Sequence, residues 1–153
     1  MSRTFPFFIK LALLLHIGTL YAQTFTNPVL PGGYPDPSIC KVGDDFYMAN
    51  SSFEYFPGIP IHKSKDLVNW TLIGHGLQRE AQCTGAVNLV DVQSNGGIYA
   101  PTLRYHDGTF YVITTAIYFD AKTKKHSGNN FIITATNPAG PWSDPVVVQG
   151  APG

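Results

Sequence analysis

Short apolar runs rich in β-branched and aromatic residues occur along this chain after residue 23. Such runs of about four to eight residues are typical of β-strands, whereas an amphipathic helix repeats every three to four residues. Helical periodicity is weak after residue 23, and glycine, proline, asparagine and aspartate separate the apolar runs. The pattern therefore predicts β-structure. The strands are expected at residues 38–42, 46–50, 59–63, 70–74, 102–105, 110–115, 131–135 and 146–148.

One arrangement of strands and turns occurs twice in the chain. Residues 36–51 (DPSICKVGDDFYMANS) align with residues 100–115 (APTLRYHDGTFYVITT) at an offset of 64. Both contain a Gly-Asp or Asp-Gly pair, which tolerates the positive φ of a hairpin turn. Further on, Trp70 and Trp142 match at an offset of 72, so the second unit is expected to carry about eight extra residues in a loop. Each unit then has four strands, with the tryptophan in the outer one.

A four-stranded unit that repeats at this length is the signature of a β-propeller blade. The predicted fold class is therefore all-β, with about two four-stranded blades in this chain. A propeller needs about four to eight blades to close, and two blades alone would leave sheet faces and edges uncovered. We therefore expect the chain to be the N-terminal part of a longer protein.

The first residues have the features of an export signal. Arg3 and Lys10 precede an apolar run at residues 11–20, and Leu-Tyr-Ala stands before Gln23. This is the pattern of a secretory signal peptide, here residues 1–22, and the run is too short to span a membrane comfortably. The mature chain is then residues 23–153, and we expect the protein to be secreted or periplasmic with no membrane association after cleavage.

Composition narrows the possible partners. The formal net charge is zero and 13% of the residues are charged, which argues against nucleic acid or an anionic membrane as a partner. The five histidines have no ligand spacing, so no metal site and no cofactor are expected. Cys40 and Cys83 could form a disulfide in a secreted chain, or they could be two separate buried thiols.

Four segments in order resemble a known family. The segments are NPVLPGGYPDPS (27–38), SSFEYFPGIPIHKSKDLVNW (51–70), GGIYAPTLRYHDGTFYVITT (96–115) and NPAGPWSDP (137–145). Together they resemble glycoside hydrolase family 43, most closely its β-xylosidase branch, and the resemblance covers residues 26–153. It implies a five-bladed propeller in the full protein, with the active site at the narrow central end. It also implies inverting hydrolysis of β-xylosides or α-arabinofuranosides from the non-reducing end of an oligosaccharide.

Asp36, in the segment GGYPDPS, matches the general base of the resembled family. Pro35 and Pro37 restrict the backbone around it, which suits a carboxylate that must be fixed in place. Aspartate beside proline is also ordinary turn chemistry. However, Ala100 occupies the same position in the second unit, so the turn by itself was not expected to need an aspartate.

The resemblance also assigns substrate contacts to Phe53, Tyr99 and Ala100. Phe53 matches an aromatic residue near the first sugar ring, and Tyr99 stands where β-xylosidases commonly have tryptophan. Ala100 follows at the floor of the pocket. Core packing is the alternative for the two aromatic residues. Glu54 could contact sugar or hydrogen-bond within the loop, and the second role is favoured.

Two carboxyl groups of the resembled family fall outside this sequence. In that family an aspartate that tunes the acid opens the third blade, and the glutamate that acts as general acid lies further on. Residues 1–153 contain neither position, so we expect this chain alone to be inactive. A non-catalytic sugar-binding propeller and a truncated product without function are the alternatives.

Overall fold

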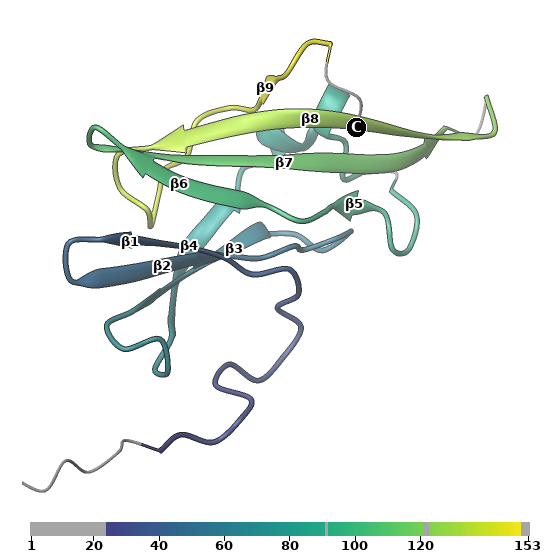
Figure 1. The fold of residues 1–153 in the computed structure, drawn as a ribbon. Helices are drawn as coiled ribbons and strands as arrows, with labels where there is room; N and C mark the ends of the chain where they lie inside the picture. The colour runs from purple at the N-terminus through teal and green to yellow at the C-terminus, as the bar shows by residue number, and fades with distance from the viewer. Residues whose placement is uncertain (1–23, 91, 121–122, 151–153) are drawn as a thin grey trace, which may run out of the picture.

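Two β-sheets form the framework of the chain in the computed structural model, which describes residues 24–90, 92–120 and 123–150. The sheets lie one above the other, and the segment that leads into the first sheet runs beneath it, on the side away from the second sheet (Figure 1). The described residues form strands, turns and two short 3-10 helices, with no α-helix among them. The expected signal peptide, residues 1–22, lies outside the described residues.

The first sheet is the first predicted blade. Its antiparallel strands are joined in sequence order. They are β1 (Ser38–Val42), β2 (Asp45–Ala49), β3 (Gly58–Ser64) and β4 (Thr71–Leu77). The predicted strands are confirmed with small shifts at their ends. Trp70 was expected inside the outer strand but lies in the turn before it, where its Nε1 donates a hydrogen bond to the carbonyl of Leu67 at 3.0 Å.

The second sheet is the second predicted blade, with one strand more than predicted. Its strands are β5 (Gly97–Ile98), β6 (Thr102–His106), β7 (Thr109–Asp120), β8 (Lys125–Ala135) and β9 (Val146–Val147). Both β5 and β6 pair with β7, at successive places along it. Tyr99 and Ala100 therefore lie in an interruption of the inner strand, between two short segments that share a partner.

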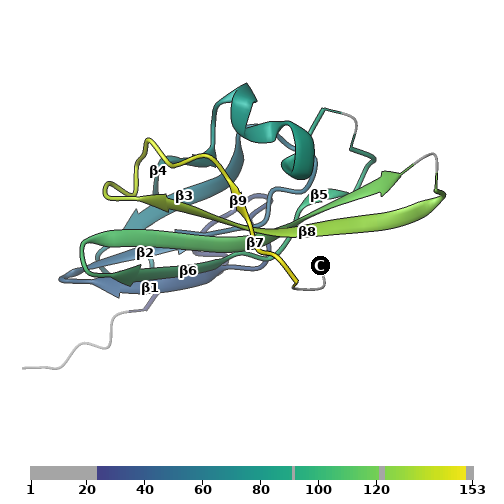
Figure 2. The ribbon, with the colours of Figure 1, turned by 90° about the horizontal axis from the view of Figure 1, so that it is seen from above.

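The extra residues of the second unit do not form the predicted loop. They lengthen the β7–β8 hairpin, in which pairing continues from Phe110 opposite Ala135 to Asp120 opposite Lys125. The hairpin runs past the end of the first sheet (Figure 2). Only the second half of β8 was predicted, at residues 131–135, because the polar first half has no strand pattern. The ladder of hydrogen bonds with β7 extends the strand into that half.

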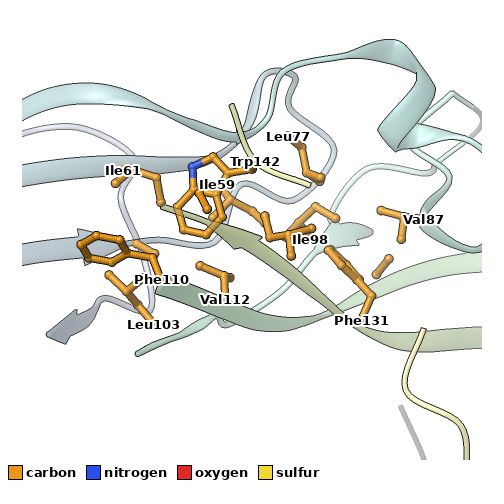
Figure 3. Close-up of a cluster of buried hydrophobic side chains, with 14 of the residues drawn as sticks. Ile59, Ile61, Leu77, Val87, Ile98, Leu103, Phe110, Val112, Phe131 and Trp142 are labelled. Carbon is orange, nitrogen blue, oxygen red and sulfur yellow. The ribbon is translucent and has the colours of Figure 1, made fainter. Parts of the chain in front are cut away.

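The core lies between the two sheets. Alternate residues of β3 and β7, among them Ile59, Ile61 and Val112, are fully buried and point into the space between the strands (Figure 3). Trp142, from the turn before β9, is 2% exposed and packs into the same cluster. The strand period of two thus places one face of each sheet in the core.

Cys40 and Cys83 both pack at this core as free thiols, which decides between the two possibilities left open by the sequence. Burial raises the pKa of both thiols.

A connection between the blades ties them together. It contains the 3-10 helices η1 (Glu80–Cys83) and η2 (Gly85–Val87). Gln82, almost completely buried in η1, donates from Nε2 to the carbonyls of Gly76 at 3.2 Å and Ser143 at 2.9 Å. One side chain therefore bonds the end of β4 to the turn of the second blade.

Candidate active site

Asp36 stands two residues before β1, at the inner edge of the first blade. Its backbone is left-handed, with φ of +53°, and its side chain is exposed at one end of the sheet. Its Oδ2 accepts a hydrogen bond from the hydroxyl of Ser51 at 2.6 Å. The carboxylate is thus held from outside its own turn.

Two residues at the end of β2 hold the turn that carries Asp36. The side-chain amide of Asn50 donates to the carbonyls of Tyr34 at 2.9 Å and Pro35 at 3.2 Å. The backbone N–H of Ser51 also donates to Pro35, at 3.2 Å. Sequence reasoning did not assign these roles. The available signal was a polar Asn-Ser-Ser run directly after an apolar strand, where buried polar groups need partners.

Asp36 and Ala100 occupy matching positions in the two units but differ in backbone conformation. Ala100 does stand two residues before its inner strand, and the N–H of Leu103 donates to Ser38 Oγ at 2.9 Å, so the two inner strands meet at these ends. However, Ala100 is not among the left-handed residues, whereas Asp36 is. Aspartate is enriched in that backbone region, so the turn itself favours an aspartate at position 36. The repeat therefore does not separate a structural aspartate from a catalytic one.

Phe53 and Tyr99 come from different blades and meet at this end of the sheets. Their rings lie edge to face, with centroids 5.6 Å apart and planes at 75°. The backbones of Phe53 and Ile98 exchange two hydrogen bonds of 2.9 Å. Phe53 is half-buried, Tyr99 is 38% exposed and Ala100 is exposed, so none of the three belongs to the buried core. Partly exposed aromatic side chains can pack against the apolar face of a sugar ring.

Several other carboxylates among the described residues have partners away from Asp36. Asp45 pairs with Lys63 at 2.8 Å, and the hydrogen bond from Lys63 lowers the pKa of Asp45. Asp66 accepts hydrogen bonds from Asn69, which hold its pKa well below the ordinary value. Asp66 therefore caps its own turn.

Asp144 pairs with Arg79 at 2.7 Å. Glu54 accepts hydrogen bonds from Ser94 and Asn95 in the loop before β5, and not within its own loop as was favoured from the sequence.

Neither a metal cluster nor a membrane-spanning helix is found in the described part of the chain. No group of three or more His, Cys, Asp or Glu residues there could hold a metal ion. No helix among the described residues is long and apolar enough to cross a bilayer.

Two packed antiparallel sheets, with a carboxylate two residues before the inner strand of the first, are the arrangement expected of two β-propeller blades. Comparison with known proteins shows the family. The family model described as glycosyl hydrolases family 43 matches residues 25–152. The chain belongs to this family. The non-reducing end α-L-arabinofuranosidase BoGH43B of Bacteroides ovatus is 57% identical over 131 residues, which is 85% of this chain and 23% of that enzyme.

Other relatives also match most of this chain over a small part of their own length. The β-xylosidase of Bacillus subtilis is 46% identical over 126 residues, which cover 82% of this chain and 23% of the relative. The crystal structure of the family 43 protein BlXynB from Bacillus licheniformis matches with a TM-score of 0.72 and 43% identity, covering 82% of this chain and 24% of that protein. The chain thus spans about a quarter of the length of these relatives.

Proposed function

We propose that this chain is the N-terminal part of a secreted or periplasmic glycoside hydrolase that removes single sugars from the non-reducing ends of xylan and arabinoxylan oligosaccharides. The observation that carries the proposal is Asp36, which stands at the inner edge of the first blade with its carboxylate oriented by Ser51. Membership of family 43 supports glycoside hydrolysis. The partner is an oligosaccharide, without nucleic acid, membrane or cofactor.

Asp36 has the role of general base in this proposal. Inverting hydrolysis needs one carboxylate to deprotonate the attacking water and a second carboxyl group, about 6.5–9.5 Å away, to protonate the leaving oxygen. Ser51 bonds Oδ2 of Asp36, which leaves Oδ1 for the water. The water attacks the anomeric carbon from the face opposite the leaving group, and the bond to the leaving oxygen breaks as that oxygen takes its proton. We assign the role of the acid to none of the carboxylates that the structure describes.

Both xylosides and arabinofuranosides are candidate substrates. The relatives are named for one or the other sugar, and the relative at 57% identity is named as an arabinofuranosidase. Phe53 and Tyr99 form a platform for one sugar ring, with Ala100 beside it. The small side chain at position 100 leaves space for that ring.

The test is hydrolysis of nitrophenyl β-D-xyloside and nitrophenyl α-L-arabinofuranoside by the full-length protein. We expect turnover of at least one substrate, and a loss of kcat of about 10²–10⁴-fold in Asp36→Asn, because general base catalysis contributes that much. Asp107→Asn is the matched control, since Asp107 is also a left-handed aspartate but lies in a hairpin turn. Turnover by Asp36→Asn at the wild-type rate would remove Asp36 as the base.

Residues 23–153 alone are expected to give no measurable turnover of nitrophenyl xyloside. The carboxylates other than Asp36 whose side chains the structure describes have structural partners or lie in hairpin turns, except Glu80, which is exposed in η1. We assign none of them as the general acid. Turnover by this chain that Asp36→Asn abolishes would contradict the expectation. Binding of xylo-oligosaccharides by the full-length protein without any hydrolysis would favour a non-catalytic sugar-binding protein instead.

A further inference from the structure

Glu54 joins two loops that approach each other from different blades. It follows Phe53 in the loop between β2 and β3 and reaches the loop before β5. Its Oε1 accepts a hydrogen bond from Ser94 Oγ at 3.4 Å, and its Oε2 accepts one from the backbone N–H of Asn95 at 3.2 Å. A carboxylate that accepts from a backbone N–H and a hydroxyl fixes the position of that loop.

The loop that Glu54 holds is also bonded to the ring of Tyr99. The carbonyl of Asn95 accepts a hydrogen bond from the phenolic hydroxyl of Tyr99 at 2.9 Å. At its other end Tyr99 is fixed through the backbone, since its N–H donates to Thr115 at 2.9 Å and its carbonyl accepts from Thr114 Oγ1 at 2.7 Å. The carbonyl of Asn95 therefore orients the ring of Tyr99, and Glu54 fixes the position of Asn95.

The backbone around this link leaves little freedom. Phe53 has φ of +47°, an unfavourable value for a bulky residue, and it is held there by its two hydrogen bonds with Ile98. Gly97 has φ of +86°, and a Cβ at that position would lie 2.0 Å from the carbonyl oxygen of Phe53. The backbones of the two loops are therefore in direct contact at Phe53 and Gly97. The side chain of Glu54 adds hydrogen bonds between the same two loops.

We propose that Glu54 is a positioning residue for the aromatic platform. It acts through Asn95 on the hydroxyl of Tyr99 and so keeps the ring of Tyr99 at its edge-to-face distance from Phe53. The link requires a hydroxyl at position 99, which phenylalanine lacks. The part that concerns substrate rests on the proposed glycosidase function. A platform that contacts the sugar equally in the ground and transition states affects KM and leaves kcat nearly unchanged.

The kinetic test is a double-mutant cycle in the full-length protein with the better nitrophenyl substrate. We expect KM to rise by about three- to tenfold in Glu54→Ala and in Tyr99→Phe, with kcat within about twofold of wild type. On the Tyr99→Phe background, Glu54→Ala should change KM by less than about twofold, because the link is already broken. Glu54→Gln keeps one acceptor and should restore part of the loss. Additive effects on KM, or a loss confined to kcat, would overturn the proposal.

A spectroscopic test does not depend on activity. In full-length protein labelled with 3-fluorotyrosine, Tyr99→Phe identifies the ¹⁹F resonance of Tyr99. Glu54→Ala should shift or broaden that resonance, whereas Glu80→Ala, a change at an exposed glutamate in η1, should not. If Glu54→Ala does not fold, the same comparison is made with Glu54→Gln and Ser94→Ala. An unchanged Tyr99 resonance overturns the proposal, and absence of hydrolysis by wild type contradicts only the proposed function.

Discussion

Left-handed backbone conformations occur at several residues of the candidate site. Asp36 has φ of +53°, Phe53 of +47° and Gly97 of +86°. For a residue other than glycine this region costs roughly 1–2 kcal/mol, and such strain persists where the surroundings enforce it, often at functional sites. Asn50 and Ser51 hold the turn at Asp36, and Ile98 holds Phe53. At the scale of single residues, contacts between loops therefore set the site's geometry.

A methyl group at position 97 should separate the two loops. We expect Gly97→Ala to lower the free energy of unfolding by about 2–4 kcal/mol, because it adds a clash with the carbonyl of Phe53 to the cost of a positive φ. Gly108→Ala is the matched control, since Gly108 has φ of +76° with open space around its Cβ position, and it should lose about 1 kcal/mol. Urea denaturation measures both. Equal losses would show that the clash is relieved at no cost.

Some of the site could be predicted at this scale and some could not. Asp36, Phe53 and Tyr99 lie in motifs of adjacent residues, so a resemblance over short segments was enough to select them as candidates. The roles of Asn50 and Gly97 depend on segments that the fold brings together. The residue type alone does not indicate which segment each of them contacts. The same reason explains the mistaken argument from Ala100, because matching positions in a repeat do not guarantee matching backbone angles.

At the scale of elements, the two blades contact each other at β4 and at the connection that follows it. A Cβ at Gly74 would lie 2.5 Å from the carbonyl oxygen of Ala139, so the second blade approaches β4 closely. Gln82 accepts hydrogen bonds from the N–H groups of Gln78 and Arg79 and donates to the turn at Ser143.

The pattern of apolar residues predicted most strands, whereas β5 has two residues and is too short to show a pattern. Hydrogen bonds with β7 make these residues a strand, although their sequence has no strand pattern.

Removal of the Gln82 side chain should loosen the contact between the blades. Gln82→Ala leaves buried carbonyl and N–H groups without partners, and we expect the free energy of unfolding to fall by about 2–3 kcal/mol. Gln78→Ala, at an exposed neighbouring glutamine, should change it by less than about 0.5 kcal/mol. Thermal and chemical denaturation of both variants compare these values. A Gln82→Ala protein as stable as Gln78→Ala would show that water replaces the network.

At the scale of the whole molecule, the second sheet has one buried face and one exposed apolar face. Along β7, Phe110, Val112 and Ala116 are buried, while the alternate residues point outward. Tyr111, Ile113 and Phe119 are each 39% exposed on that outer face. An apolar stripe of this kind on a sheet favours association with another surface.

We therefore expect purified residues 23–153 to self-associate as concentration rises. Ile113→Lys should raise the concentration needed for association by about tenfold, because a buried unpaired charge costs at least the 1.4 kcal/mol that a factor of ten requires. Val90→Lys is the control, because Val90 is 75% exposed outside the sheets. Sedimentation velocity over a range of concentrations measures the change. An identical effect of the two substitutions would place the association elsewhere.

By itself the sequence determined most of the strands, the duplication of the blade and the position of Asp36 before an inner strand, because apolar runs and hairpin turns depend on neighbouring residues. Tertiary structure alone decided how that carboxylate is held, how the inner strand of the second blade is interrupted and how Glu54 reaches Asn95. Glu54 and Asn95 are 41 positions apart, and Asp36 and Ser51 are 15 apart. Such hydrogen bonds form only when packing of the two sheets brings distant loops together, and local sequence carries no signal of that approach.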